Sequence, residues 1–369
     1  MTPKEMIGDL KDPRNQKNQK YPFETLVIAA VCAVMAGEDS FTGIAEYVEN
    51  NVDRLSEFIN FPENKTPSHD LFRWIFELLD PNILNNWLFD LTNKLIENDE
   101  RFEKNELSHI GIDGKTIRNS KDKLHIVHAF CTKNRLLLLQ EKVDEKSNEI
   151  TAIPKLLEAL DLEGTVITID AMGCQREICK QIIEKNGDYI IAVKENQKKL
   201  FGDIKEEFIL REDSNEITNF THYDKGHGRL ETRVCSVIIP DHWLLDEHKW
   251  PGLKMIVRVL NKTEKKGKIS EEERFFISSL QKPVDIILQI IRDHWRIENS
   301  LHYILDVTFN EDKACVRCEN AAYNLSILRK LAMNILQNAK TEKQSMKSMI
   351  RKCSNPIVAE KFLIKFYHS

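Results

Sequence analysis

The sequence predicts an α/β protein in which a mixed sheet is flanked by helices, carries a β-rich insertion and follows an all-helical N-terminal domain. Three changes of hydrophobic period support this prediction. Apolar residues recur at helical spacing over about 22–97, strands and helices follow one another over about 108–193, and strand patterns dominate about 205–282. Successive strands followed by alternating helices and strands are typical of a mixed sheet with helices on its faces.

The first quarter of the chain, residues 1–104, is the predicted N-terminal domain. Its apolar residues fall three and four positions apart, as at Ile44 and Val48, and prolines interrupt the pattern. We expect the polar residues 1–20 to be frayed or loop-like, and the charged residues 98–105 to form a linker.

The second domain is predicted at 105–340, before a basic C-terminal tail at 341–369. Its expected strands are 109–112, 124–131, 135–143, 165–170 and 188–193, and its expected helices are 150–160, 175–185, 283–305 and 319–339. The run 165–170 is almost entirely apolar, as in a central strand covered on both faces. The insertion at about 205–282 is expected to contain strands 222–227, 229–239, 253–260 and 274–280, with 261–273 as a polar loop.

Composition limits the classes of function. The formal net charge is -5, so a nucleic-acid surface must be a local basic patch. The longest apolar run, 26–37, is far shorter than the roughly 20 residues of a membrane span, so we expect a buried helix and no membrane association.

The 8 cysteines show no disulfide framework and indicate reduced thiols in a cytosolic protein. Cys315 and Cys318 form a lone CxxC pair, for which unrelated thiols are favoured over zinc.

Three carboxylates stand in apolar surroundings. Asp113 lies in His-Ile-Gly-Ile-Asp-Gly, Asp170 ends an apolar strand, and Glu298 lies in the helical stretch His-Trp-Arg-Ile-Glu-Asn. Such a carboxylate is costly unless it is paired, hydrogen-bonded or bound to a metal. If the strands that carry the two aspartates are neighbours, these residues meet at one sheet edge, where open α/β sheets place their sites. Three carboxylates and one phosphodiester offset two divalent cations, so the set predicts a metal site for phosphoryl transfer.

Each carboxylate also has a structural alternative. Asp113 precedes a glycine, and Asp-Gly after a strand is a common turn, so Asp113 could be a structural turn residue. Asp170, which precedes Ala-Met-Gly, could be a turn residue for the same reason. Glu298 shares a helix face with Ile291 and Trp295, and we expect this face to point into the protein. At the edge of that face, Glu298 would pair instead with a basic neighbour.

The basic neighbours of Glu298 are His294, His302 and arginines, and rival acids also lie nearby. Asp306 is about 80° around the helix from Glu298. Glu311 and Asp312 follow the point where the helical pattern fades. The geometry therefore favours Glu298 as the third acid.

Basic and amide residues flank both aspartates. Lys115 and Arg118 follow Asp113 and are predicted to contact phosphates, with a solvated loop as the alternative. After the strand that follows Asp170 come Lys194, Asn196 and Gln197, which either reach a DNA backbone or cap the next helix.

Several stretches in a fixed order carry a family resemblance. They are Asp-Pro-Arg at 12–14 with Tyr-Pro at 21–22, Gly-Ile-Asp-Gly-Lys-Thr-Ile-Arg at 111–118, Asp-Ala at 170–171 with Cys-Gln at 174–175, Asp-Tyr-Ile-Ile-Ala-Val-Lys at 188–194 with Asn-Gln at 196–197, Gly-His-Gly-Arg-Leu-Glu-Thr-Arg at 226–233, Phe-Ile-Ser-Ser-Leu at 276–280, His-Trp-Arg-Ile-Glu-Asn at 294–299, and Leu-His-Tyr-Ile-Leu-Asp-Val at 301–307 with Phe309, Glu311 and Asp312. In these stretches and in their order, the chain resembles bacterial insertion-sequence transposases of the DDE type, in the H-repeat-associated (ISAs-one) group.

The resemblance implies a ribonuclease-H-like core with Asp113, Asp170 and Glu298 as catalytic and metal-binding acids. It implies two Mg²⁺ ions, for which Mn²⁺ can substitute, and double-stranded DNA of the element ends and the target as partner. In the implied in-line reaction, one metal activates water and the other stabilises the leaving 3′ oxygen, and the freed 3′-OH then attacks target DNA. A homodimer in the bacterial cytoplasm, associated with the nucleoid, is expected, with the N-terminal domain binding DNA ends or dimerising.

The resemblance also implies further DNA contacts. The glycine-rich turn at 226–233 would lie near the DNA ends. The DNA-binding candidates there and beside Glu298 are His227, Arg229, Arg233, His294 and Arg296. The Tyr, Arg and Lys that broader relatives carry around the glutamate are replaced here by Ile291, His294 and Leu305. Candidate helpers of Glu298 are therefore Arg296, His294 and Lys313.

Two other functions remain open. One is a catalytically silent, transposase-derived DNA-binding protein, which the presence of all three acids argues against. The other is a ribonuclease-H-like nuclease without strand transfer, which the helical N-terminal region and the large insertion argue against.

Overall fold

The computed structural model describes residues 2–15, 19–62, 65–97, 107–118, 123–143, 148–226, 228–314, 316 and 318–368. The linker predicted at 98–105 lies outside the described residues.

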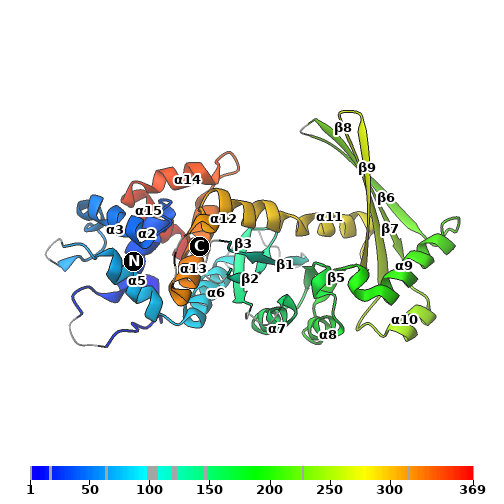
Figure 1. Cartoon of the computed structure of the whole chain (residues 1–369), viewed down its shortest axis with the longest axis horizontal. Coiled ribbons are helices and arrows are strands. Elements are labelled where there is room, and N and C mark those ends of the chain that lie inside the picture. Colours follow the sequence, from blue (N-terminus) through cyan, green and yellow to red (C-terminus); the bar gives the residue numbers. More distant parts are fainter. Residues whose placement is uncertain are drawn as a thin grey trace.

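Helices from both ends of the chain pack together as one helical unit (Figure 1). The N-terminal members are α1 (Pro3–Ile7), α2 (Phe23–Met35), α3 (Phe41–Asn50), α4 (Val52–Leu55), α5 (His69–Leu78) and α6 (Pro81–Glu97). The C-terminal members are α13 (Glu319–Ala339), α14 (Met346–Cys353) and α15 (Pro356–His368). α13 contacts α2, α5 and α6, and both α14 and α15 contact α2.

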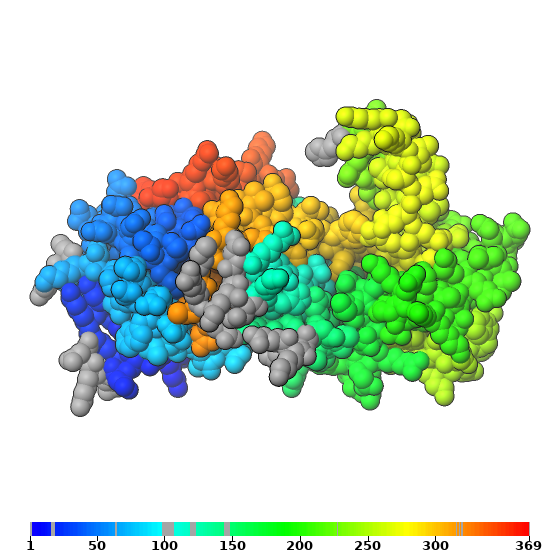
Figure 2. Space-filling view, in the orientation of Figure 1, coloured from blue at the N-terminus to red at the C-terminus, as the bar shows by residue number. Residues whose placement is uncertain are grey.

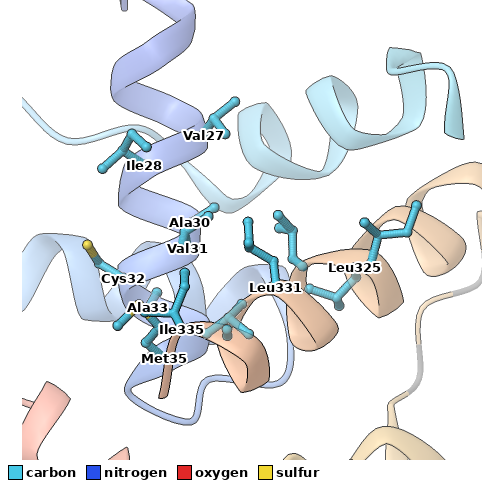
Figure 3. Close-up of a cluster of buried hydrophobic side chains, with 14 of the residues drawn as sticks. Val27, Ile28, Ala30, Val31, Cys32, Ala33, Met35, Leu325, Leu331 and Ile335 are labelled. Carbon is cyan, nitrogen blue, oxygen red and sulfur yellow. The ribbon is translucent and has the colours of Figure 1, made fainter. Parts of the chain in front are cut away.

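Helix α2 is the centre of this unit. Every residue from Leu26 to Met35 is buried, and Leu325, Leu331 and Ile335 of α13 lie across it (Figure 3). Each fully buried aliphatic side chain contributes roughly 1.5–3 kcal/mol. The apolar run is therefore a buried helix, as predicted, because other helices surround it.

Both chain ends are more ordered than the sequence predicts. Residues 1–20 were expected to be frayed, but a capping box of Thr2 and Glu5 begins α1, which buries Met6 and Ile7. Within the segment 341–369, which was expected to be a basic tail, lie α14 and α15. Their apolar sides are buried, so the basic composition of the segment conceals two amphipathic helices.

The centre of the protein is a nine-stranded mixed sheet with the order β3-β2-β1-β4-β5-β9-β8-β7-β6. Its strands are β1 (Ser108–Thr116), β2 (His125–Cys131), β3 (Leu136–Lys142), β4 (Thr165–Ile169), β5 (Asp188–Val193), β6 (Thr218–Gly226), β7 (Arg229–Ile238), β8 (Met255–Lys265) and β9 (Lys268–Ser278). Only β1–β4 and β4–β5 are parallel among the described pairs. The predicted mixed sheet flanked by helices is confirmed.

Helices cover both faces of the first five strands (Figure 1). α7 (Glu149–Ala159), α8 (Arg176–Glu184) and α9 (Lys198–Leu210) pack on one face, and α11 (Val284–His294) packs on the other. Strand β4 is buried throughout, which confirms the central strand predicted from its continuous apolar run. The outer strand β3 contacts α6 and α13, so the sheet and the helical unit are packed together.

The strands β6–β9 extend the sheet through the β5–β9 pair, and α10 (His242–His248) lies between β7 and β8. Their far ends project from the body as an arm (Figures 1 and 2). Residues 261–273, expected to be a loop, belong to the β8–β9 hairpin, with Lys265 paired to Lys268. Many side chains of this hairpin are exposed, so its strands are held by backbone pairing rather than by apolar burial. The hydrophobic pattern of the sequence therefore does not predict these strands.

The helix predicted at 283–305 is interrupted. α11 ends at His294, a turn follows at Trp295, and a π-helical turn, η4 (Glu298–His302), leads into α12 (Tyr303–Val307). No helix in the described part of the chain has the length and apolarity required to cross a membrane.

Candidate active site

Asp113 and Asp170 lie side by side because their strands are parallel neighbours. The β1–β4 register ends with Ile112 opposite Ile169, and Asp113 and Asp170 are the residues that follow these two in sequence. Asp113 is inside β1 rather than in a turn, since β1 continues beside β2, where His128 is its partner. Both aspartates line the same cleft, which has a volume of about 590 Å³.

The backbone fixes Asp170 at the end of β4. Its carboxylate caps the short helix η2 (Ala171–Gly173), and Oδ1 accepts hydrogen bonds from the amides of Met172 (2.9 Å) and Gly173 (3.4 Å). These bonds hold one carboxylate oxygen in place at the mouth of the cleft.

Glu298 borders the same cleft from the helical side. Ile291, His294 and Trp295 line the cleft with it, so the predicted common face exists. The face points into the protein at Ile291 and His302, which are buried, but not at Trp295 or at Glu298, whose side chain is 74% exposed. After the turn at Trp295, Ile297 contacts the core instead.

Two glycines allow groups from opposite faces of the sheet to approach Asp113. A Cβ at Gly111 would collide with Ile297, so this glycine allows the helical segment to lie close to β1. A Cβ at Gly114 would collide with the carboxylate of Glu149, which begins α7. The Gly-Ile-Asp-Gly sequence therefore fits the close packing around Asp113.

Glu149 is a fourth acid that the sequence analysis missed. Its Oε1 lies 2.9 Å from His125 Nε2, and its charge acts on both aspartates. An acidic residue in the first turn of a helix is ordinary, so no sequence signal distinguishes it.

The clustered charges perturb the aspartates. Burial, followed by the negative charge of Asp170, raises the pKa of Asp113 from 3.8 to about 7. Burial, followed by the charge of Glu149, raises the pKa of Asp170, while backbone hydrogen bonds and Lys194 oppose that rise. A bound cation would relieve this mutual repulsion.

Two buried histidines adjoin the acids. His302 Nδ1 lies 3.3 Å from Glu298 Oε2 and 3.8 Å from Asp113 Oδ2, and its Nε2 lies 3.3 Å from His128 Nδ1. Burial lowers the pKa of both histidines, which favours neutral rings. The sequence named His302 as a partner of Glu298 but missed His128, whose role depends on the β1–β2 register.

The chemistry of these donors fits a divalent cation. Asp113, Glu298 and His302 offer ligand atoms within 4.8 Å of one another, and Asp170 adjoins Asp113. Carboxylate oxygens suit Mg²⁺ and Mn²⁺, and imidazole nitrogen suits transition-metal ions.

The rival acids are engaged elsewhere. Lys115 Nζ lies 2.6 Å from Asp306 Oδ1, 2.7 Å from Glu311 Oε2 and 3.7 Å from Asp312 Oδ1. Lys330 Nζ lies 2.7 Å from Glu311 Oε1. The Lys115 side chain is buried in this ionic network, and its contact with DNA stays a prediction that this burial disfavours. Burial alone would lower the pKa of Lys115, but the charges of Glu311 and Asp306 raise it.

The two amides predicted to contact DNA have a local role. Asn196 Nδ2 donates to the carbonyl of Ala171 (2.6 Å), and Gln197 Nε2 donates to that of Cys174 (2.8 Å). Both therefore hold the turn after Asp170, and their contact with a DNA backbone stays a prediction.

Two other predicted DNA-binding residues, Lys194 and His294, line the cleft, whereas Arg118 does not. Lys194 is exposed. The Arg118 side chain is 84% exposed, with Nε 3.5 Å from Asp312 Oδ2. His294 Nδ1 lies 2.8 Å from Thr168 Oγ1, and burial lowers its pKa to about 4.

Of the candidate helpers of Glu298, Arg296 pairs with Asp293 (3.0 Å). Lys313 is exposed in η5 (Glu311–Lys313), and His294 contacts Thr168. The group that contacts Glu298 is instead His302.

A recess between the arm and α11 adjoins the cleft. Its basic lining is Arg229, Arg233, Arg274 and Arg292, and its aromatic lining is Phe276 and Trp295. The Arg274 guanidinium lies 4.1 Å from the Trp295 ring centroid. Arg229 and Arg233 both pair with Glu231, so their charges are partly offset.

Two predictions cannot be followed in the structure, since His227 and Cys315 lie outside the described residues. The described cysteines are free thiols, and Cys32, Cys174 and Cys235 are among the buried ones.

Comparison with known proteins agrees with this architecture. A family model described as "Transposase DDE domain" matches residues 104–335, and one described as "DDE_Tnp_1-associated" matches residues 4–91. The H repeat-associated putative transposase YhhI of Escherichia coli K12 is 35% identical over 95% of this chain and 94% of its own. The putative transposase YncI of Escherichia coli O157:H7 is 36% identical over 94% of this chain and 90% of its own.

A protein described as "Uncharacterized protein in dhlA 3'region" of Xanthobacter autotrophicus is 37% identical over 75% of this chain and 94% of its own. The model match over more than half of the chain and the similarity to relatives along nearly its whole length show that this chain belongs to the DDE transposase family.

Proposed function

We propose that this protein cuts phosphodiester bonds at the ends of an insertion sequence and joins the 3′-OH ends to target DNA. The observation that carries the proposal is the gathering of Asp113, Asp170 and Glu298 around one cleft from two strands and a helical segment distant in sequence. Family membership supports the same reaction.

We infer that β1–β5 with their covering helices form a ribonuclease-H-like core. The order β3-β2-β1-β4-β5, with two parallel pairs around β4, supports this inference. The strands β6–β9 would then be an insertion between the second aspartate and the glutamate, because they return to the core through β9 and lead into α11.

In this proposal Asp113, Asp170 and Glu298 hold the divalent cations, Mg²⁺ or Mn²⁺. When bound, such ions would activate the attacking oxygen and stabilise charge on the leaving 3′ oxygen. The chain's own contribution is position: the amides of Met172 and Gly173 fix Asp170, and His302 adjoins both Glu298 and Asp113.

Double-stranded DNA is the proposed partner. Lys194 and Arg274 line the cleft and carry charge that would offset phosphates. The adjoining recess, with Arg229, Arg233 and Arg292, would continue this path under the arm. We further propose that the protein acts as a homodimer in the bacterial cytoplasm, associated with the nucleoid, and that the helical unit binds element ends or the partner copy.

Two alternatives would use the same cleft. A silent DNA-binding protein requires none of the acids, yet all three are present and border one space. A nuclease without strand transfer would cut DNA but not join it.

Purified protein and oligonucleotides from inverted repeats bracketing the gene would test the proposal. We expect cleavage with Mg²⁺ or Mn²⁺, and joining of a pre-cut 3′ end to target DNA. Asp113→Asn and Asp170→Asn should each abolish cleavage and keep DNA binding. Cleavage in excess chelator would refute the metal requirement, and cleavage without joining would identify a nuclease. Binding without any cleavage would identify the silent protein.

A further inference from the structure

We infer that His302 is a metal ligand, so that one cation site has a mixed donor set of Asp113, Glu298 and His302. This inference rests on the proposed function for the site but goes beyond its three acids. A nitrogen donor would make this site prefer Mn²⁺, or a later transition-metal ion, over Mg²⁺.

The distances support shared coordination. His302 Nδ1 lies 3.3 Å from Glu298 Oε2 and 3.8 Å from Asp113 Oδ2. Two ligand atoms about 2.1 Å from one ion are roughly 3 to 3.5 Å apart when they are neighbours in an octahedron or a tetrahedron. The first contact falls in this range, and the second needs only a small movement of a side chain.

The far side of the imidazole has the partner that a metal-binding histidine needs. Such a histidine commonly donates its second ring N–H to an acceptor that fixes its orientation. His302 Nε2 lies 3.3 Å from Nδ1 of His128, which is completely buried. If His302 Nε2 donates this bond, the Nδ1 lone pair points between the carboxylates.

That arrangement leaves a place for a cation. A lone pair facing two carboxylates is repulsive, and a metal ion would turn the repulsion into three favourable contacts. The alternative is that Nδ1 carries a proton and donates it to Glu298, so that His302 only positions the acid. The two arrangements differ in whether nitrogen contacts the metal.

The local backbone keeps these groups together. Glu298 and His302 are the first and last residues of the π-helical turn, and π-helical turns are frequent at functional sites. Glu298 is largely exposed while His302 is buried, so one side chain is adaptable and the other is held by the core. A rigid nitrogen beside a movable carboxylate suits a site that takes up an ion from solution.

The test is pulsed electron paramagnetic resonance of Mn²⁺ bound to the full-length protein, without DNA. We expect an imidazole ¹⁴N coupling in the wild-type protein and its loss in Asp113→Asn, which removes a carboxylate ligand from the same site. His302→Asn keeps an amide near the Nδ1 position and should lose the coupling. We expect its affinity for Mn²⁺ to fall about tenfold or more, with a smaller loss for Mg²⁺ measured by competition.

His294→Asn is the matched control. His294 also lines the cleft, but its Nδ1 contacts Thr168, so this variant should keep the coupling.

Bound Mn²⁺ without ¹⁴N coupling in the wild-type protein would overturn the inference, even if His302→Asn failed to fold. Equal losses of Mn²⁺ and Mg²⁺ affinity in His302→Asn would also overturn it and assign a positioning role. If the wild-type protein cleaves DNA but shows no ¹⁴N coupling, the proposed function holds and the inference about His302 is refuted. If it shows the coupling but never cleaves DNA, the metal site is supported and the proposed function is refuted.

Discussion

Replacing Asp113 by asparagine should stabilise the metal-free protein at neutral and alkaline pH. The pKa of Asp113 is raised from 3.8 to about 7, mainly by burial and by Asp170. The folded protein therefore retains this proton up to about pH 7, whereas the unfolded chain releases it near pH 4. The folded state binds more protons in this window, so stability falls as pH rises through it.

The size of the effect follows from the two pKa values. Each pH unit between them corresponds to about 1.4 kcal/mol, which gives an upper bound of about 4 kcal/mol above pH 7. The Asp113 side chain is 28% exposed, so water reduces this penalty. We expect Asp113→Asn to gain about 2 kcal/mol in free energy of unfolding at pH 8, and roughly 2–4 °C in Tm.

The assay is urea and thermal unfolding in the presence of chelator at pH 8.0 and pH 4.5. The advantage of Asp113→Asn should be clear at pH 8.0 and mostly absent at pH 4.5, where the carboxyl group is largely protonated in the folded protein. Asp246→Asn, at an exposed position of α10, is the control for loss of one negative charge and should change little. Added Mn²⁺ should stabilise the wild-type protein more than Asp113→Asn. Equal or lower stability of Asp113→Asn at pH 8.0 would refute the reasoning.

Three further predictions concern the other charged groups. Glu298→Gln should eliminate cleavage with a Tm change under about 2 °C, because the side chain is mostly exposed; retained cleavage would show that another acid completes the site. Glu311→Gln should lower the free energy of unfolding by about 3 kcal/mol in urea, because it removes the ion-pair partner of two buried lysines, and an unchanged midpoint would contradict this account. Arg118→Ala should reduce the salt dependence of DNA binding by a slope of about one, and an unchanged slope would show that Arg118 makes no phosphate contact.

The sequence predicts those elements that apolar side chains define. Strand β5 and helix α13 begin and end where their hydrophobic patterns predict, because both are buried. The β8–β9 hairpin escapes prediction because its outer part is polar and exposed. The interruption at Trp295 also escapes, because a π-helical turn preserves an approximate helical period.

The same distinction holds for the candidate site. The sequence predicts that the two aspartates lie close together because each comes at the end of an apolar strand. The two strands are parallel neighbours in the sheet. The true environment of Lys115 depends on Glu311, which is 196 residues away in sequence. No local sequence pattern indicates such a pairing, so the basic segment after Asp113 predicts a phosphate contact and not the buried ion pair that Lys115 makes. His128 is missed for the same reason, since its place depends on strand register.

The positions of Asp113 and Lys115 also show how the helical unit supports the cleft. Alternate residues of a strand share a face, so Asp113 and Lys115 point to the same side of β1. Asp113 adjoins His302 there, and Lys115 binds Glu311, which in turn binds Lys330 of α13. Because α13 packs against α2 and α5, a buried ionic network joins the strand that carries the first aspartate to helices from both ends of the chain. Displacing α13 would leave Glu311 and Lys115 without part of their neutralising charge, so the position of β1 depends on the helical unit as well as on the sheet.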